Sequence, residues 1–231
     1  MSDANDANNK VVATAEGLTS DAFHRLLDLA ITGRGKLLGA RTIANNQLRQ
    51  RNDQEDAIRW LSNQHIALAG GQGFATNWGG FLLSLVTIPA NMAAAAFIQA
   101  RAVAAIAHLR GYELDDPRVR TAILVVMLGP RGSAALIAAG DLPSSAAAVA
   151  TAPAFDPRLD ARVSRALLEQ SMNHVGGKRL GVFLAKKIPL VGGGVGAVVD
   201  GWSTRSIIQY AQEQFISRRP RATGYVVIVE N

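Results

Sequence analysis

The chain has 231 residues, 48% of them hydrophobic, with 24 Lys and Arg against 18 Asp and Glu, which gives a formal net charge of +6. This length suits one domain with a substantial core, and the absence of cysteine excludes disulfides, thiolate metal sites and thiol nucleophiles. The basic residues are scattered and few aromatic residues alternate with them, so a nucleic-acid surface is not expected, and the positive charge favours an anionic membrane surface instead.

The amino-terminal segment MSDANDANNK is polar and lacks the basic and apolar regions of a signal peptide. We therefore expect residues 1–18 to form a disordered tail, residues 19–217 to form one domain, and residues 218–231 to form a second tail. A chain without cysteine also fits a reducing compartment, so the expected location is the cytoplasm, at or near the inner face of the membrane.

Apolar residues at helical intervals run through most of the chain and predict an all-α fold, a compact multi-helix bundle with glycine-rich bends. Two Asp-Pro pairs, Asp116-Pro117 and Asp156-Pro157, predict helix starts, because the carboxylate caps free amides and a proline at the first position loses no hydrogen bond. The expected helices span residues 19–49, 53–69, 78–86, 89–109, 117–128, 131–140, 144–151, 157–174, 178–187 and 193–218.

Two segments depart from this helical pattern. Gly33, Gly35 and Gly39 weaken the middle of the first expected helix, so a break is expected there. Near the carboxyl end, GYVVIVE (residues 224–230) has consecutive β-branched residues and is the one segment predicted to form a strand.

Residues 60–100 contain no Asp, Glu, Lys or Arg. Within them, residues 79–99 approach the length of about 20 apolar residues that spans a bilayer, but Pro89 and Asn91 interrupt the run. Two interpretations stay open, a buried turn and central helix of a soluble core, or a segment that dips into or lies along a membrane. The expected membrane contacts are Trp78, Phe81, Leu82, Leu83, Lys178, Arg179, Lys186 and Lys187.

The stretch KKIPLVGGGVGAVVDGW contains Gly192, Gly194 and Ala197 at the spacing of the dinucleotide-binding fingerprint. Pro189 lies where that fold needs a central strand, and the preceding chain offers helices rather than further parallel strands. We therefore expect no cofactor, and interpret the glycines as a bend that leads into the last helix.

Candidate chemistry is confined to a few polar residues. Arg101 and His108 lie seven residues apart on one face of an apolar helix, Arg120 follows on the next helix, and Asp200 lies on the last. They can form a satisfied structural network, a ligand site or an acid–base site. The four histidines lack the spacing of metal ligands, and neither a phosphate loop nor a nucleophile elbow is present, so no metal and no catalytic residue is assigned.

Three blocks of the chain resemble the EcsC protein family. They are ITGRGKLLGARTIA (residues 31–44), PANMAAAAFIQARAVAAIAHLRGYELDDPRVRTAILVVMLG (residues 89–129) and PLVGGGVGAVVDGWSTRSIIQYAQEQF (residues 189–215). The resemblance implies a link to an ABC-transporter or secretion system and brings no catalytic residue with it. Characteristic positions of the family pattern are matched by Arg101, His108, Asp116, Arg120 and Asp200.

These observations lead to three hypotheses about function. The first is a non-enzymatic protein that associates peripherally with membranes or binds an anionic lipid or another hydrophobic ligand. The second is a soluble scaffold or regulator of a membrane transporter or secretion system. The third is an enzyme that uses Arg101, His108 and Asp200, and it requires these side chains to meet at an open pocket.

Overall fold

The computed structural model describes residues 22–70, 90–185 and 194–218, with side chains over 22–70, 93–171 and 203–218. The described chain is predominantly helical, which confirms the predicted all-α fold. After a helix over residues 22–32, the helices are α2 (Ala40–Arg51), α3 (Gln54–Gly70), α5 (Ala90–Leu109), α6 (Pro117–Met127), α7 (Gly129–Ala138), α8 (Ala146–Ala150), α9 (Pro157–Ala185) and α10 (Gly194–Gln214).

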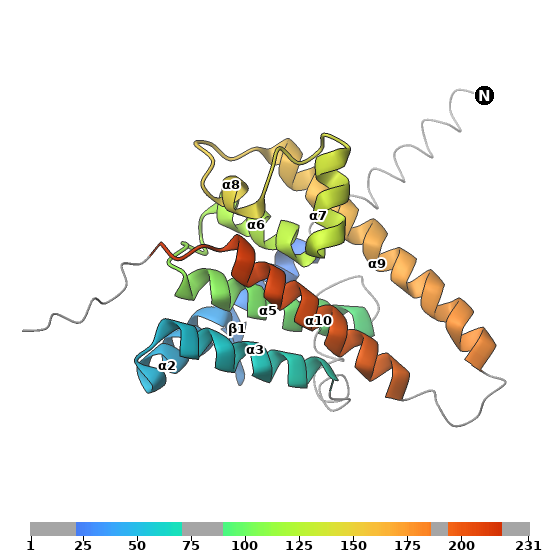
Figure 1. The fold of residues 1–231 in the computed structure, drawn as a ribbon, viewed down its shortest axis with the longest axis horizontal. Helices are drawn as coiled ribbons and strands as arrows, with labels where there is room; N and C mark the ends of the chain where they lie inside the picture. The colour runs from blue at the N-terminus through green and yellow to red at the C-terminus, as the bar shows by residue number, and fades with distance from the viewer. Residues whose placement is uncertain (1–21, 71–89, 186–193, 219–231) are drawn as a thin grey trace, which may run out of the picture.

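Helix α5 forms the centre of the bundle, where α2, α3, α6 and α10 all pack against it (Figure 1). None of the residues from Ala93 to Leu109 is exposed, and most are alanine. A helix that is apolar on all sides must be covered on all sides, and small side chains let its neighbours approach closely. The final part of the charge-free stretch, residues 93–100, is therefore core, whereas residues 71–89 lie outside the described chain.

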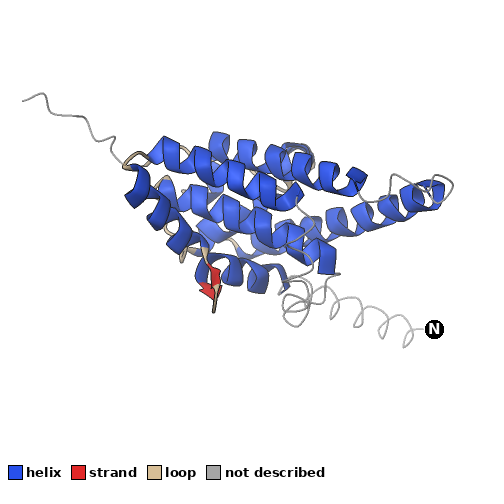
Figure 2. Ribbon diagram, turned by 90° about the horizontal axis from the view of Figure 1, so that it is seen from below, coloured by secondary structure: helices blue, strands red, loops and turns tan. Residues whose placement is uncertain are grey.

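A β-hairpin interrupts the first expected helix. Strands β1 (Gly33–Arg34) and β2 (Leu37–Leu38) pair antiparallel between the helix over 22–32 and α2 (Figure 2). The prediction of a break was confirmed, but the prediction that only residues 224–230 form a strand was wrong, and that segment lies outside the described residues. Gly33 has φ +74°, and a Cβ at Gly33 or at Gly39 would overlap backbone of the facing arm. Glycine at both positions therefore closes the neck of the hairpin.

The two helix starts predicted from the Asp-Pro pairs were confirmed. The Asp116 carboxylate accepts from the amide of Arg118 at 2.9 Å, and that of Asp156 accepts from the amide of Arg158 at 2.8 Å. The expected end of the next helix near residue 174 and the separate helix expected over 178–187 were both wrong, because α9 continues to Ala185 through three glycines. Each glycine weakens a helix by about 1 kcal/mol but does not end it unless a cap or a proline follows.

Helices α6 and α7 form a sharp elbow. They are bent by 108° at Gly129, whose φ of +72° suits glycine. The Ser133 hydroxyl donates to the Val125 carbonyl at 3.0 Å and so satisfies a group near the end of α6. Over the described residues no single helix is both long and apolar enough to cross a membrane, and only this bent pair reaches that length and composition when its two helices are taken together.

The ends of four helices lie at one end of the bundle. Helices α3 and α5 run antiparallel, since His65 contacts Arg101 while Glu55, ten residues earlier, pairs with Arg110. The end of α3 and the start of α5 therefore lie together, and the end of α9 and the start of α10 lie at the same end of the molecule (Figure 1).

Candidate functional site

A buried contact between α3 and α5 brings together an arginine and a histidine. The Arg101 Nε donates to His65 Nε2 at 3.1 Å, and His65 Nδ1 lies 2.8 Å from the Leu61 carbonyl, one turn earlier on α3. Arg101 is 8% exposed and His65 is fully buried. Because Nε2 accepts from a guanidinium, Nδ1 carries the only proton of the ring, so His65 is held neutral.

The electrostatics agree with this protonation state. Burial and the neighbouring Arg101 charge lower the pKa of His65 to about 4. Burial also lowers the pKa of Arg101, to about 10, which leaves the guanidinium charged at neutral pH. No carboxylate of the described residues forms an ion pair with Arg101, so a cation lies in the interior beside neutral partners only.

The hairpin and α5 complete the surroundings of Arg101. Its Nη1 lies 3.5 Å from the Leu38 carbonyl, at the long limit of a hydrogen bond, and its guanidinium carbon lies 5.2 Å from the centre of the Phe97 ring. Leu38 belongs to β2 and its side chain is 47% exposed. The guanidinium is thus held between a buried histidine and the underside of a surface hairpin.

His108 and Arg120, which the sequence groups with Arg101, have other partners. His108 Nε2 lies 3.0 Å from Asn45 Oδ1 on α2. Arg120 pairs with Asp28 of the helix over residues 22–32. The shared helix face of Arg101 and His108 therefore does not join them into one network.

A second polar cluster links the helix over 22–32 with α6 and α9. Asp160 accepts from Thr121 at 2.6 Å, and its other oxygen lies 2.9 Å from His24 Nε2. The hydrogen bond to Asp160 raises the pKa of His24 above its usual value. Burial alone would raise the pKa of Asp160, but the hydrogen bonds from His24 and Thr121 lower it overall. Each charge in this cluster has a partner.

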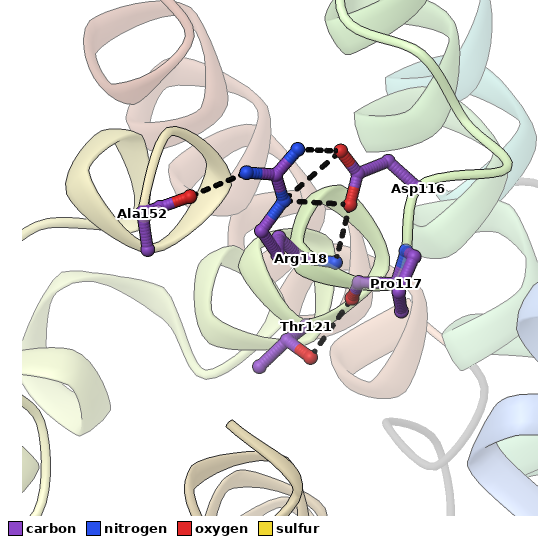
Figure 3. A network of polar contacts seen from close by, with 5 residues as sticks. All are labelled: Asp116, Pro117, Arg118, Thr121 and Ala152. Carbon is purple, nitrogen blue, oxygen red and sulfur yellow. Dashed lines mark hydrogen bonds and ion pairs between the residues drawn. The ribbon is translucent and has the colours of Figure 1, made fainter. Parts of the chain in front are cut away.

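Asp116 belongs to a structural network at the start of α6 (Figure 3). Besides capping the helix, its carboxylate accepts from the guanidinium of Arg118, which also donates to the Ala152 carbonyl. Thr121 donates to the Pro117 carbonyl in the same view. The arrangement ties the start of α6 to the chain after α8, so it accounts for Asp116 by stability alone.

Several predicted residues cannot be assigned contacts. The side chain of Asp200 on α10 lies outside the described part, as do those of all the expected membrane contacts, Trp78, Phe81, Leu82, Leu83, Lys178, Arg179, Lys186 and Lys187. Within the described residues, no group of three or more His, Asp or Glu side chains is arranged to hold a metal ion.

The comparison with known families agrees with the sequence blocks. A sequence model of the EcsC protein family matches residues 3–219. The chain belongs to the EcsC protein family. No curated protein and no solved structure matches it.

In this EcsC protein, two of the family-like blocks meet at Arg101. The first block forms the hairpin that supplies the Leu38 carbonyl, and the second forms α5, which carries the arginine. Sequence reasoning selected Arg101 but missed His65, His24 and Asp160. The available signal for His65 was its position on the apolar face of α3, one turn after Leu61 in a stretch without charges.

Proposed function

We propose that this EcsC protein is a non-enzymatic protein that associates peripherally with anionic membranes, at the inner face of the membrane. The observation that carries the proposal is that α3 and α9 end, and α5 and α10 begin, at one end of the bundle. Residues 71–89, which contain no Asp, Glu, Lys or Arg, leave α3 and return to α5 at that end.

The chain between α9 and α10 carries positive charge. Helix α9 ends at Ala185 and α10 begins at Gly194, and the residues between them include Lys186 and Lys187 (Figure 1). Each basic residue near an anionic surface contributes about 1 kcal/mol, and stable peripheral binding needs two signals, such as an apolar segment and a basic patch. The sequence that follows α3 supplies the apolar segment, and the sequence that follows α9 supplies the basic residues.

Flotation with lipid vesicles tests the proposal. Wild-type protein is expected to float with vesicles of equal parts phosphatidylcholine and phosphatidylglycerol, and to stay behind with phosphatidylcholine alone. The double variant Leu82→Asp with Leu83→Asp is expected to lose flotation, whereas Ile216→Asp, at an exposed apolar residue after α10, is expected to keep it.

Charge reversal at two lysines separates the contribution of the basic residues from that of the apolar segment. Lys186→Glu with Lys187→Glu should weaken flotation and remove its salt dependence, and Arg131→Glu with Arg158→Glu, at two exposed arginines elsewhere, should leave both unchanged. Failure of the wild-type protein to float with anionic vesicles contradicts the proposal, as does an equal loss in the control variants.

The alternative is a soluble scaffold or regulator of a membrane transporter or secretion system. The large apolar side chains exposed in the described residues, Leu38, Ile137, Phe155 and Ile216, come singly from four different segments of the chain, and single exposed apolar residues do not by themselves indicate a protein-binding face. We therefore place membrane association first.

A further inference from the structure

Among the residues that the structure describes, Arg101 differs from other arginines with little-exposed side chains in having no opposite charge beside it. Arg110 pairs with Glu55, Arg118 with Asp116, and Arg120 with Asp28. Arg101 is 8% exposed, and its hydrogen-bond partners are a neutral histidine and a backbone carbonyl. A buried cation is costly unless an anion compensates it, so this site lacks one component.

The described parts of the chain around Arg101 do not supply that anion. Gln99 donates to Thr204 and so faces α10. Two residues later the helix has turned by about 200°, so Arg101 points away from α10, the helix that carries Asp200. Residues 71–89, which join the two helices of the Arg101–His65 contact, contain neither Asp nor Glu. The hairpin over residues 33–38 also contains no acid, but carries Arg34 and Lys36.

Three of the five guanidinium N–H groups of Arg101 make no hydrogen bond to the residues that the structure describes. Of its five N–H groups, one is used by His65 and one makes the long contact to Leu38. Nε is used by the buried bond to His65 on α3, and Nη1 lies 3.5 Å from the Leu38 carbonyl of β2, so the Nη edge lies on the hairpin side of the guanidinium. This edge is the one that binds a carboxylate or phosphate with two parallel hydrogen bonds.

We propose that Arg101, held in place by His65, binds an oxyanion, the carboxylate or phosphate group of a ligand, beneath the β1–β2 hairpin. The neutral imidazole of His65 accepts from Arg101 Nε and so orients the Nη edge of the guanidinium. Gly33 and Gly39 let the two arms of the hairpin approach closely, which fixes the position of the hairpin beside Arg101. The site uses none of the residues to which membrane association is assigned, so the two proposals stand or fall separately.

Thermal unfolding and calorimetric binding of the full-length protein test the site with defined probes. The probes are inorganic phosphate, acetate, dodecyl phosphate and dodecanoate below their micelle concentrations, with dodecanol and sodium chloride as controls. At least one anionic probe should bind and raise the unfolding midpoint, and neither control should. Binding of inorganic phosphate or acetate identifies a free anion as the ligand, and binding of the dodecyl forms alone identifies a lipid-like amphiphile.

Substitution of the arginine gives the decisive comparison. Arg101→Met should weaken binding of the active probe about a hundredfold, because one partner of a buried charged pair is lost. Without anion, its unfolding midpoint should equal or exceed that of the wild type, since a buried charge without a counterion has been removed. Arg101→Lys keeps the positive charge but loses the planar donors that can make two parallel hydrogen bonds to one oxyanion. It should therefore bind the active probe with intermediate affinity.

Arg118→Met is the matched control, because Arg118 already has a carboxylate partner. It should lower the unfolding midpoint and leave probe binding unchanged. The proposal is overturned if no anionic probe binds wild-type protein, if Arg101→Met binds as tightly as wild type, or if its midpoint falls as that of Arg118→Met does. Flotation of Arg101→Met with anionic vesicles should match the wild type, which separates this outcome from a failure of membrane association.

Discussion

Two histidines in this protein lie in opposite electrostatic surroundings. His65 accepts a hydrogen bond from a cation in the core, which favours the neutral ring, whereas His24 lies against the Asp160 carboxylate, which favours the charged ring. The cluster around His24 is balanced within the chain, with Arg120 paired to Asp28 beside it. The cluster around His65 has a positive charge and no anion among the described residues. The first cluster is accounted for by stability, whereas we assign the second to binding.

The largest expected effect on the free energy of unfolding comes from lowering the pH. The unfolded chain takes up a proton on His65 near pH 6.5, but the folded protein does so only near pH 4. Stability that is present above pH 6.5 should therefore be lost as the pH falls toward 4, by an amount on the order of 3 kcal/mol. His24 contributes in the opposite sense, because its raised pKa adds stability below pH 6.5 that is lost as the pH rises.

Histidine proton resonances followed against pH, together with urea unfolding at each pH, check this pair of signs. His65 should remain neutral down to about pH 4, and His24 should titrate above its usual value. Titration of both rings near pH 6.5 would remove the contrast between the two clusters.

Alanine substitution in the hairpin should lower stability more at Gly39, where its two arms approach closely, than at Gly35 in its turn. Gly39→Ala places a Cβ against the backbone of the facing arm, so it should cost about 2 to 3 kcal/mol of unfolding free energy. Gly35→Ala meets no atom within 4 Å and is strained only by its φ of +59°, so it should cost about 1 kcal/mol. Chemical denaturation measures both, and equal costs would mean that the neck is not constrained as described.

The cluster of His24, Thr121 and Asp160 depends on one carboxylate, that of Asp160. Asp160→Ala removes the partner of both His24 and Thr121, and should cost about 2 kcal/mol because the side chain is largely buried. Asp141→Ala is the control, since the Asp141 side chain is 47% exposed and makes only a long ion pair of 3.8 Å with Arg162, and it should cost less than about 1 kcal/mol. Thermal or urea unfolding distinguishes them, and an unchanged stability in Asp160→Ala would contradict the structural role.

The smallest effect is the coupling between His65 and Arg101. His65→Leu leaves the Arg101 Nε without its acceptor, and this cost should shrink when Arg101 is also replaced by methionine. A double-mutant cycle by urea unfolding should give a coupling of about 1 kcal/mol. Additive effects would show that the contact contributes nothing to stability.

The parts of the fold that sequence reasoning predicted are those set by local chemistry. The Asp116 and Asp156 caps were predicted because capping needs only residues within one turn. The hairpin was missed because glycines that break a helix look the same in sequence as glycines that close a strand pair. The difference lies in the close approach of the two arms at Gly33 and Gly39, which is a property of the fold.

The site was predicted in part for a related reason. Arg101 stood out as the first charge after a long stretch without charges, but its partner had to come from another helix. The helix face shared with His108 pointed to a partner on the same helix, whereas packing brought His65 from α3 against it. Periodicity assigns faces to one helix and does not determine which faces of two helices meet.

The elbow at Gly129 changes how the hydropathy of this chain should be understood. A profile along the sequence adds the 11 residues of α6 to the 10 of α7 and finds enough apolar length for a bilayer. In space the two legs diverge by 108°, and each reaches only about 15 Å, roughly half of the hydrocarbon thickness. A single glycine with positive φ thus divides this apolar length between α6, whose residues are mostly buried, and α7, whose residues are mostly exposed.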